Sequence, residues 1–289
     1  MNRIINGVGN LIVLAVMAYF LTGFMLRMIN PWHIVALIAV VALLPFLFGP
    51  ILIRRTYRMS LNPSLVPFDP EGPGSPEELR SHFAATTNDL DRLGFEPVRY
   101  YQLKMTHSGA DGWVLFHRNG KTGETSRVIT SVGTSDVVRI GTSFVVFVSD
   151  FSDGTRVVTS NRDSAYVHPP RKPPYHGRAF PQVRDVGHLY VAHRARVESL
   201  AAGRIAIDPA RDDPDGYLRS IDIDEPFAYH VACGYAYNDE MGGVQRATWK
   251  GAILSTWKLL PPIKQIRLGW ERLMAARQLG NLRVGRPVT

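Results

Sequence analysis

Cysteine is nearly missing from this chain: among its 289 residues only Cys233 carries a thiol. One cysteine builds no disulfide framework, which agrees with a reducing compartment. Acidic residues are missing from residues 1–60, where aspartate and glutamate do not occur at all. No stretch of the chain carries a complete catalytic, cofactor-binding or metal-binding motif, so the sequence informs on location and architecture more than on activity.

Two long apolar runs fill the part that lacks acidic residues. They cover roughly 4–28 and 32–53, and a tight Asn30–Pro31 turn separates them. Each is about as long as the ~20 residues that cross a bilayer. A cleaved signal peptide is the alternative for the first run, but a small-x-small cleavage site is missing and a second run follows at once. The sequence therefore predicts a two-helix transmembrane hairpin over 1–58.

Arginines at the ends of the runs predict the orientation of the hairpin. Arg3 precedes the first run, and three arginines follow the second: Arg54, Arg55 and Arg58. Only Arg27, beside the connecting turn, argues the other way. Positive residues accumulate on the cytoplasmic side of membrane proteins. We therefore expect a multi-pass protein of the bacterial inner (cytoplasmic) membrane, with both termini and the rest of the chain in the cytoplasm.

Basic charge gathers at the two ends of the chain, whose formal net charge is +8. Residues 1–60 hold five Lys or Arg and no acid, residues 244–289 hold nine Lys or Arg and one acid, and the middle has a net charge of −5. Basic segments beside a cytoplasmic leaflet meet anionic lipid, each Lys or Arg contributing ~1 kcal/mol near the surface. We expect the lipid bilayer and anionic lipid headgroups as partners, a protein partner as a further candidate, and no nucleic acid.

Behind the hairpin the pattern predicts a linker and an α+β domain. Residues 59–76 are rich in proline and glycine, which is typical of an extended linker. A helix over roughly 77–93 follows a Ser-Pro start. Five β-rich segments with short turns come next: Val98–Met105, Gly112–Arg118, Ser126–Ser131, Thr142–Phe151 and Thr155–Ser160. Short connections force antiparallel neighbours, so 77–203 should form a four- to five-stranded antiparallel sheet, covered by this helix and by the segment 185–202.

Residues 204–289 are predicted to form a helical region with a small hairpin at 234–248. Two helices follow the hairpin, Thr248–Leu260 and Ile263–Leu279. Tryptophans and aliphatic residues recur on one face of each, beside Lys and Arg, which is the composition of a helix in the membrane interface. The alternative is that this face packs against the protein body. Together with the arginines after the second run, the predicted membrane-interface residues are Arg54, Arg55, Arg58, Trp249, Lys250, Trp257, Lys258, Lys264, Arg267 and Trp270.

Three stretches resemble a pattern in a family of uncharacterised bacterial proteins, commonest among planctomycetes. They are Leu93–Phe95, Phe151–Asn161 and His188–Val197, and the resemblance covers roughly 77–203. It implies an α+β domain with one strand meander and covering helices. It implies no activity, and the membrane hairpin is not part of it.

Patterns that suggest a phosphate or metal site each have a simpler explanation. Gly120–Thr122 matches the end of a phosphate-binding loop, but the glycine that the loop needs at position 115 is a leucine, and a strand follows rather than a helix. His188 and His193 are spaced i, i+5, which does not place both rings on one helix face. The acidic tract over 212–225 lacks the glycine-containing frame of a calcium loop. We therefore expect no cofactor, no metal and no catalytic residue.

These observations predict a membrane-anchored scaffold or sensor on the cytoplasmic face, without enzymatic activity. One alternative is an enzyme whose site combines scattered residues, with His188, His193 and Asp185 as candidates. A deep polar pocket lined by these groups would favour the enzyme, whereas exposed apolar patches would favour the interaction module. A second alternative is a membrane-tethered, winged-helix-like nucleic-acid binder, because the hairpin at 234–248 and the helix after it resemble a wing. Acidic residues before that hairpin would repel phosphate.

Overall fold

The computed structural model describes residues 15–19, 31–72, 77–104, 110–133, 139–162, 174–201 and 203–285. The chain divides into two compact units, Met1–Gly49 and Pro50–Thr289. Helices combine with a mixed sheet, which confirms the α+β class predicted from the sequence.

The second apolar run folds as a helix, α2 (Pro31–Thr56), and its portion Trp32–Thr56 is long and apolar enough to cross a membrane. Its large side chains are mostly exposed, and Trp32 is 74% exposed. Burial of apolar surface is the main gain of folding, so this exposure indicates a membrane-associated segment. Among the described residues α2 is the one candidate span. The first predicted span, 4–28, lies outside them apart from the helical residues 15–19.

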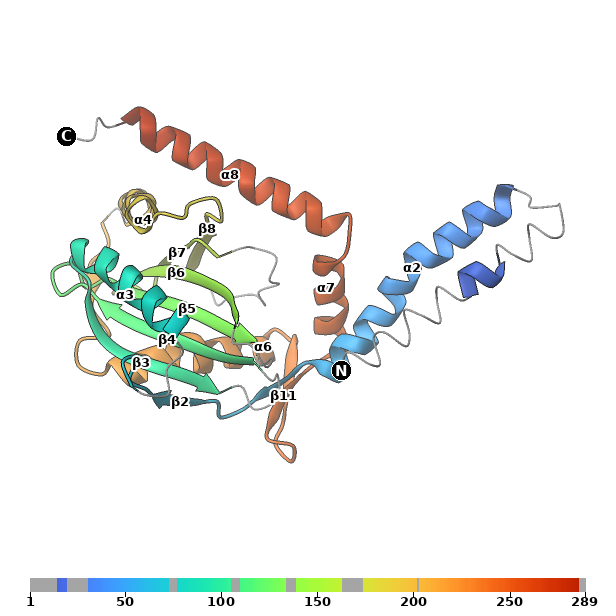
Figure 1. Cartoon of the computed structure of the whole chain (residues 1–289), viewed down its shortest axis with the longest axis horizontal. Coiled ribbons are helices and arrows are strands. Elements are labelled where there is room, and N and C mark those ends of the chain that lie inside the picture. Colours follow the sequence, from blue (N-terminus) through green and yellow to red (C-terminus); the bar gives the residue numbers. More distant parts are fainter. Residues whose placement is uncertain are drawn as a thin grey trace. The chain divides into compact units, whose positions relative to one another are not determined.

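The second unit is built around an eight-stranded sheet with the order β2-β3-β4-β5-β6-β7-β8, and β9 pairs with β6 (Figure 1). Its strands are β2 (Ser64–Pro67), β3 (Glu96–Lys104), β4 (Ala110–Arg118), β5 (Thr125–Gly133), β6 (Arg139–Phe151), β7 (Arg156–Ser160), β8 (Tyr175–Ala179) and β9 (Ala206–Ile207). Neighbours run antiparallel from β2 to β7, whereas β8 is parallel to β7.

The prediction of a four- to five-stranded antiparallel sheet is wrong in size and in type, since the sheet is larger and mixed. Two of the additional strands are β2, which contains Pro67 and lies in the proline-rich segment 59–76 that we predicted to be a linker, and β8, which contains no proline. Both are edge strands of the sheet. At an edge, a proline without an N–H group costs no hydrogen bond of the ladder, so proline content does not exclude a strand there.

Helices cover both faces of the sheet (Figure 1). On one face are α3 (Glu77–Arg92) and α4 (Val186–Leu200), and on the other are α5 (Pro214–Arg219), the π-helical turn η1 (Ser220–Asp224) and α6 (Glu225–Ala232). Successive residues of a strand point to opposite faces. Leu115 accordingly packs in the core beneath α3 and α4, and its neighbour Phe116 packs with α5 and η1. Cover on both faces explains why the central strands are apolar on both.

A smaller sheet has the order β1-β11-β10. Its strands are β1 (Arg58–Ser60), β10 (Ala236–Asp239) and β11 (Val244–Ala247). β1 begins at Arg58, the last residue of the predicted hairpin, and continues into the predicted linker. It pairs antiparallel with β11 from the far end of the chain. Pairing over such a separation leaves no local signal in the sequence.

The helix α7 (Trp249–Leu259) packs closely against the stretch that leads into β10. A Cβ atom added to Gly251 would lie 2.0 Å from the carbonyl oxygen of Tyr235, so only glycine fits there. α7 is therefore attached through its small residues, and its aromatic face remains outside. Trp249 is 50% exposed and Trp257 is 51% exposed.

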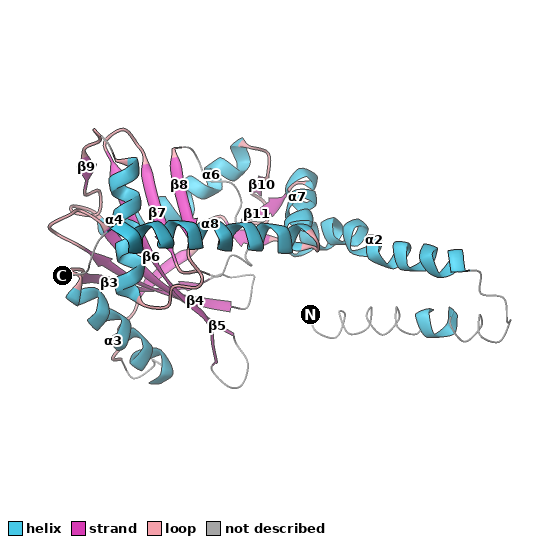
Figure 2. Ribbon diagram, turned by 90° about the horizontal axis from the view of Figure 1, so that it is seen from above, coloured by secondary structure: helices cyan, strands magenta, loops and turns pink. Residues whose placement is uncertain are grey.

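The last described helix, α8 (Ile263–Gly285), crosses α4 (Figure 2). Its carboxyl-terminal half packs on the domain, because Ala275 is buried in the core and Leu279 lies against it. Its first turns leave Ile266 and Trp270 mostly exposed. The predicted apolar face of the C-terminal helices is thus partly packed and partly exposed.

Candidate functional site

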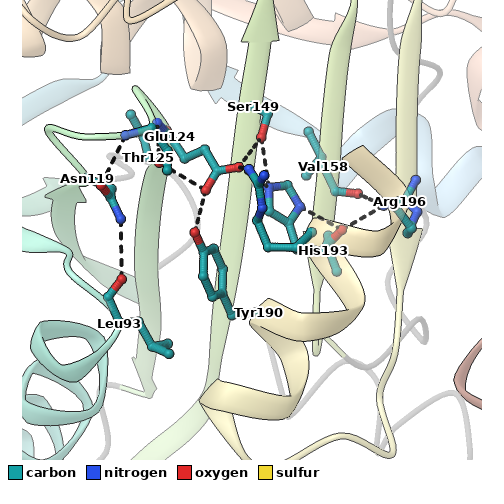
Figure 3. A network of polar contacts seen from close by, with 12 residues as sticks. Leu93, Asn119, Glu124, Thr125, Ser149, Val158, Tyr190, His193 and Arg196 are labelled. Atoms are coloured by element: carbon teal, nitrogen blue, oxygen red, sulfur yellow. Dashed lines mark hydrogen bonds and ion pairs between the residues drawn. The ribbon is translucent and has the colours of Figure 1, made fainter. Parts of the chain in front are cut away.

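A buried polar network lies between the sheet and α4 (Figure 3). Its centre is Glu124, which directly precedes β5 and whose carboxylate accepts hydrogen bonds from four side chains. The donors are Tyr190 Oη at 2.7 Å, Arg194 Nη1 at 2.6 Å, Ser149 Oγ at 3.1 Å and Thr122 Oγ1 at 3.1 Å. His193 continues the network, with Nε2 2.9 Å from Ser149 Oγ.

Serine, histidine and an acid side by side suggest nucleophilic catalysis. Here the three side chains are buried, so a substrate cannot reach them. His193 is 0% exposed, and Ser149 and Glu124 are each 3% exposed. Burial lowers the pKa of His193 to about 3, so the ring is neutral at physiological pH. Burial alone would raise the pKa of Glu124, but the hydrogen bonds from Tyr190 and Arg194 and the charge of Arg194 lower it. The network is therefore a structural part of the core, and its hydrogen bonds hold α4 against the sheet.

The opposite face of the sheet carries an open cavity of about 730 Å³, which we call the polar hollow. It lies where the end of β6 and the start of β7 meet α5 and α6. Asp150 sits in its wall and accepts hydrogen bonds from Tyr217 Oη at 2.5 Å and from Arg156 Nε at 2.6 Å. A second guanidinium nitrogen of Arg156, Nη1, donates to Glu225 Oε2 at 2.8 Å.

Among the residues that the structure describes, the lining of the polar hollow is acidic overall. It includes Asp150, Asp153, Asp213 and Glu225, against Arg156 alone of the basic residues in that lining. Burial and the charge of Asp150 raise the pKa of Tyr217 well above its usual range, so this phenol stays protonated as a donor. Such a lining favours a cationic group over an anionic one.

A second, smaller cavity of about 370 Å³ lies at the carboxyl end of α2, and we call it the basic hollow. Its lining residues are Ile51, Arg54, Arg55, Arg58, Tyr237, Arg246 and Trp249. The Arg54 guanidinium carbon is 4.6 Å from the centre of the Trp249 ring, which is a cation–π distance. Four of the ten predicted membrane-interface residues therefore meet in one place.

The remaining predicted interface residues lie elsewhere. Lys250 Nζ donates to the Cys233 carbonyl oxygen at 2.7 Å, and Lys258 Nζ donates to Tyr235 Oη at 3.1 Å. These two lysines hold α7 to the end of α6 and to the residue that precedes β10, a role that the sequence does not reveal. Trp257 and Trp270 are exposed on α7 and α8, and Lys264 and Arg267 are half-buried on α8.

The candidates of the enzyme alternative do not gather around a cavity. His193 is buried in the core, whereas His188 is exposed at the start of α4. Asp185 caps that helix, since its carboxylate accepts from the His188 backbone N–H at 2.6 Å. Over the described ranges, no three or more His, Cys, Asp or Glu side chains are arranged to hold a metal ion.

Sequence reasoning missed the residues that complete both hollows. Tyr237 and Arg246 join the basic hollow through the pairing of β1 with β11 and of β11 with β10. Asp150, Arg156 and Tyr217 meet only because β6, β7 and α5 pack together. Neither set forms a spaced motif, so no local pattern could have indicated it.

Comparison with protein-family models, with curated proteins and with solved structures finds no match to this chain. The resemblance over 77–203 therefore stays a prediction.

Proposed function

We propose that the chain is a membrane-anchored, non-enzymatic interaction module that acts as a scaffold or sensor on the cytoplasmic face of the bacterial inner membrane. The observation that carries this proposal is α2, which exposes apolar side chains along 25 residues and ends in arginines. Lipid is the environment that such a surface fits.

The finer topology belongs to the same proposal. The apolar run at 4–28 supplies a second span, so the protein is multi-pass. Arg54, Arg55 and Arg58 keep the segment after α2 in the cytoplasm. Both termini are then cytoplasmic, and the domain of the second unit works beside the inner leaflet.

Exposed apolar side chains support an interaction module over an enzyme. Trp249, Trp257, Ile266 and Trp270 are at least half exposed, and exposed apolar surface marks contact with a membrane or a partner. The polar hollow is the candidate surface for recognising a protein partner, and its lining suits a cationic side chain.

Nucleic acid is disfavoured by the charge of the helices that precede the β10–β11 hairpin. Asp222, Asp224 and Glu225 lie in η1 and at the start of α6. Asp222 is already paired with Arg127 inside the domain. Carboxylates at this position repel a phosphate backbone.

Reporter fusions test the proposed topology. A phosphatase reporter, active only outside the cytoplasm, and a fluorescent reporter, active inside it, are fused in turn after Arg58 and after Thr289. We expect fluorescence and no phosphatase activity at both points. Phosphatase activity at either point would overturn the cytoplasmic placement.

A further inference from the structure

Four arginines surround the basic hollow, and they come from three separate elements. Arg54 and Arg55 lie on the last turn of α2, Arg58 opens β1, and Arg246 lies on β11. Arg58 and Arg246 are direct cross-strand partners, and Tyr237 is the next residue in the same row. Direct partners point to the same face of the sheet, so the fold itself brings these charges together.

This arrangement leaves positive charge uncompensated. Arg246 Nε is 2.8 Å from Asp239 Oδ2, which balances one charge. Within the described part of the chain, Arg54, Arg55 and Arg58 have no carboxylate partner, and none of the residues lining the hollow is acidic. Like charges directly opposite each other destabilise a strand pair, and a bound anion removes that cost.

We propose that the basic hollow binds the phosphate group of a membrane lipid headgroup. Guanidinium groups bind phosphate through paired, charge-assisted hydrogen bonds. A phosphomonoester carries about −1.5 to −2 charges at neutral pH, so it suits this set of arginines better than a singly charged phosphodiester. The favoured headgroup is therefore a phosphomonoester such as that of phosphatidic acid.

The apolar part of the lining identifies a lipid, rather than free phosphate, as the source of this group. Trp249 and Ile51 border the hollow and are 50% and 39% exposed. Arg54 directly follows the apolar portion of α2, which is the headgroup level for a helix that crosses a bilayer. Tryptophan prefers the same level. This step rests on the membrane anchoring of the proposed function.

Calorimetric titration of the full chain in neutral detergent micelles tests the site. The probes are dihexanoyl phosphatidic acid, dihexanoyl phosphatidylglycerol and inorganic phosphate. We expect phosphatidic acid to bind at least tenfold more tightly than either of the others. Arg54→Gln combined with Arg58→Gln should weaken that binding at least tenfold. Arg272→Gln combined with Arg277→Gln removes the same charge from α8 and should change it less than twofold.

Arg54 also contacts Trp249, so its replacement can disturb the fold. Arg55→Gln is the second variant, because Arg55 is exposed and forms no hydrogen bond or ion pair within the part of the chain that the structure describes. It should weaken binding at least threefold. If the α8 double variant weakens the binding of phosphatidic acid as much as the Arg54, Arg58 variant does, the lipid is held by the overall positive charge of the protein. That result would overturn the site. Equal affinity for inorganic phosphate would overturn the lipid assignment, and no binding of any probe would overturn both. The reporter fusions remain independent, since they test anchoring and orientation without reference to the hollow.

Discussion

Glu124 and His193 show how single residues of this domain keep polar groups inside the core. Each is satisfied by several partners from different elements, as a buried polar group requires. His193 hydrogen-bonds through both ring nitrogens, to Ser149 and to Thr159. Hydroxyl partners can donate or accept, so they suit a neutral ring in either tautomer. The stability of the domain therefore depends on His193 staying uncharged.

Acid should destabilise the domain through its buried histidines. Burial lowers the pKa of His193 to about 3 and that of His117 to about 4. In the unfolded chain a histidine has its usual pKa of about 6.5. The unfolded state then binds more protons below pH 6.5, so the free energy of unfolding falls as pH decreases from about 6.5 toward 4. We expect a slope of up to about 2.7 kcal/mol per pH unit for the two rings.

His193→Gln isolates one of the two contributions to that slope. The variant should lower the slope by about 1.4 kcal/mol per pH unit. His176→Gln, at an exposed position of β8, is the matched control and should leave the slope unchanged. Urea titrations at several pH values measure it, and an unchanged slope in His193→Gln would contradict the argument.

At the scale of elements, the placement of α7 depends on one glycine. Gly251→Ala places a methyl group against the backbone at Tyr235, which cannot move without shifting β10. We expect a loss of about 1–3 kcal/mol in the free energy of unfolding, as for other overpacked sites. Gly269→Ala on α8 meets nothing within 4 Å and should instead be neutral or stabilise the helix by up to about 1 kcal/mol. Similar effects of both changes would refute the packing argument.

The exposed tryptophans of α7 and α8 should bind anionic vesicles. In a protein that lacks residues 1–49, Trp257→Ser combined with Trp270→Ser should weaken binding to vesicles about tenfold, or about 1.4 kcal/mol. Binding should also weaken as salt rises, because salt screens charges beyond ~8–10 Å. Co-sedimentation with vesicles measures both effects. Full binding by the double variant would show that these helices do not lie on the membrane.

Charge reversal on α7 is a poor test of the same surface. Lys250 and Lys258 both donate hydrogen bonds within the domain. Replacing them with Glu would break these contacts and place new negative charge beside the acceptors. A loss of vesicle binding in such a variant would not separate membrane contact from local unfolding.

At the scale of the whole molecule, the second unit should fold without the first. Deleting residues 1–49 keeps β1 and the basic hollow, and we expect cooperative unfolding of a soluble domain. Deleting 1–60 also removes β1 and exposes the edge of β11. Because a net backbone hydrogen bond contributes about 0.5–1.5 kcal/mol, the longer deletion should lower the free energy of unfolding by roughly 2 kcal/mol more. Equal stability of the two proteins, measured by urea titration, would show that β1 is dispensable.

The sequence by itself determined the features that depend on local composition and periodicity. These are the α+β class, the membrane-length helix that became α2, and the gathering of basic charge at both ends. Hydropathy and side-chain period act over neighbouring residues, so they can be read without knowing the fold.

Tertiary structure alone decided the extent of the sheet and the composition of both hollows. β2 became a strand although it contains Pro67, because an edge position tolerates proline. β8 became a strand through parallel pairing with β7. Arg58 meets Arg246, and Asp150 meets Tyr217, only after strands and helices distant in sequence have paired. The register of paired strands is set by the packing of the whole sheet. A shift of the register by one residue would turn each side chain of the strand to the other face. The four arginine positions of the basic hollow are therefore a property of the fold, although three of them were already conspicuous in the sequence.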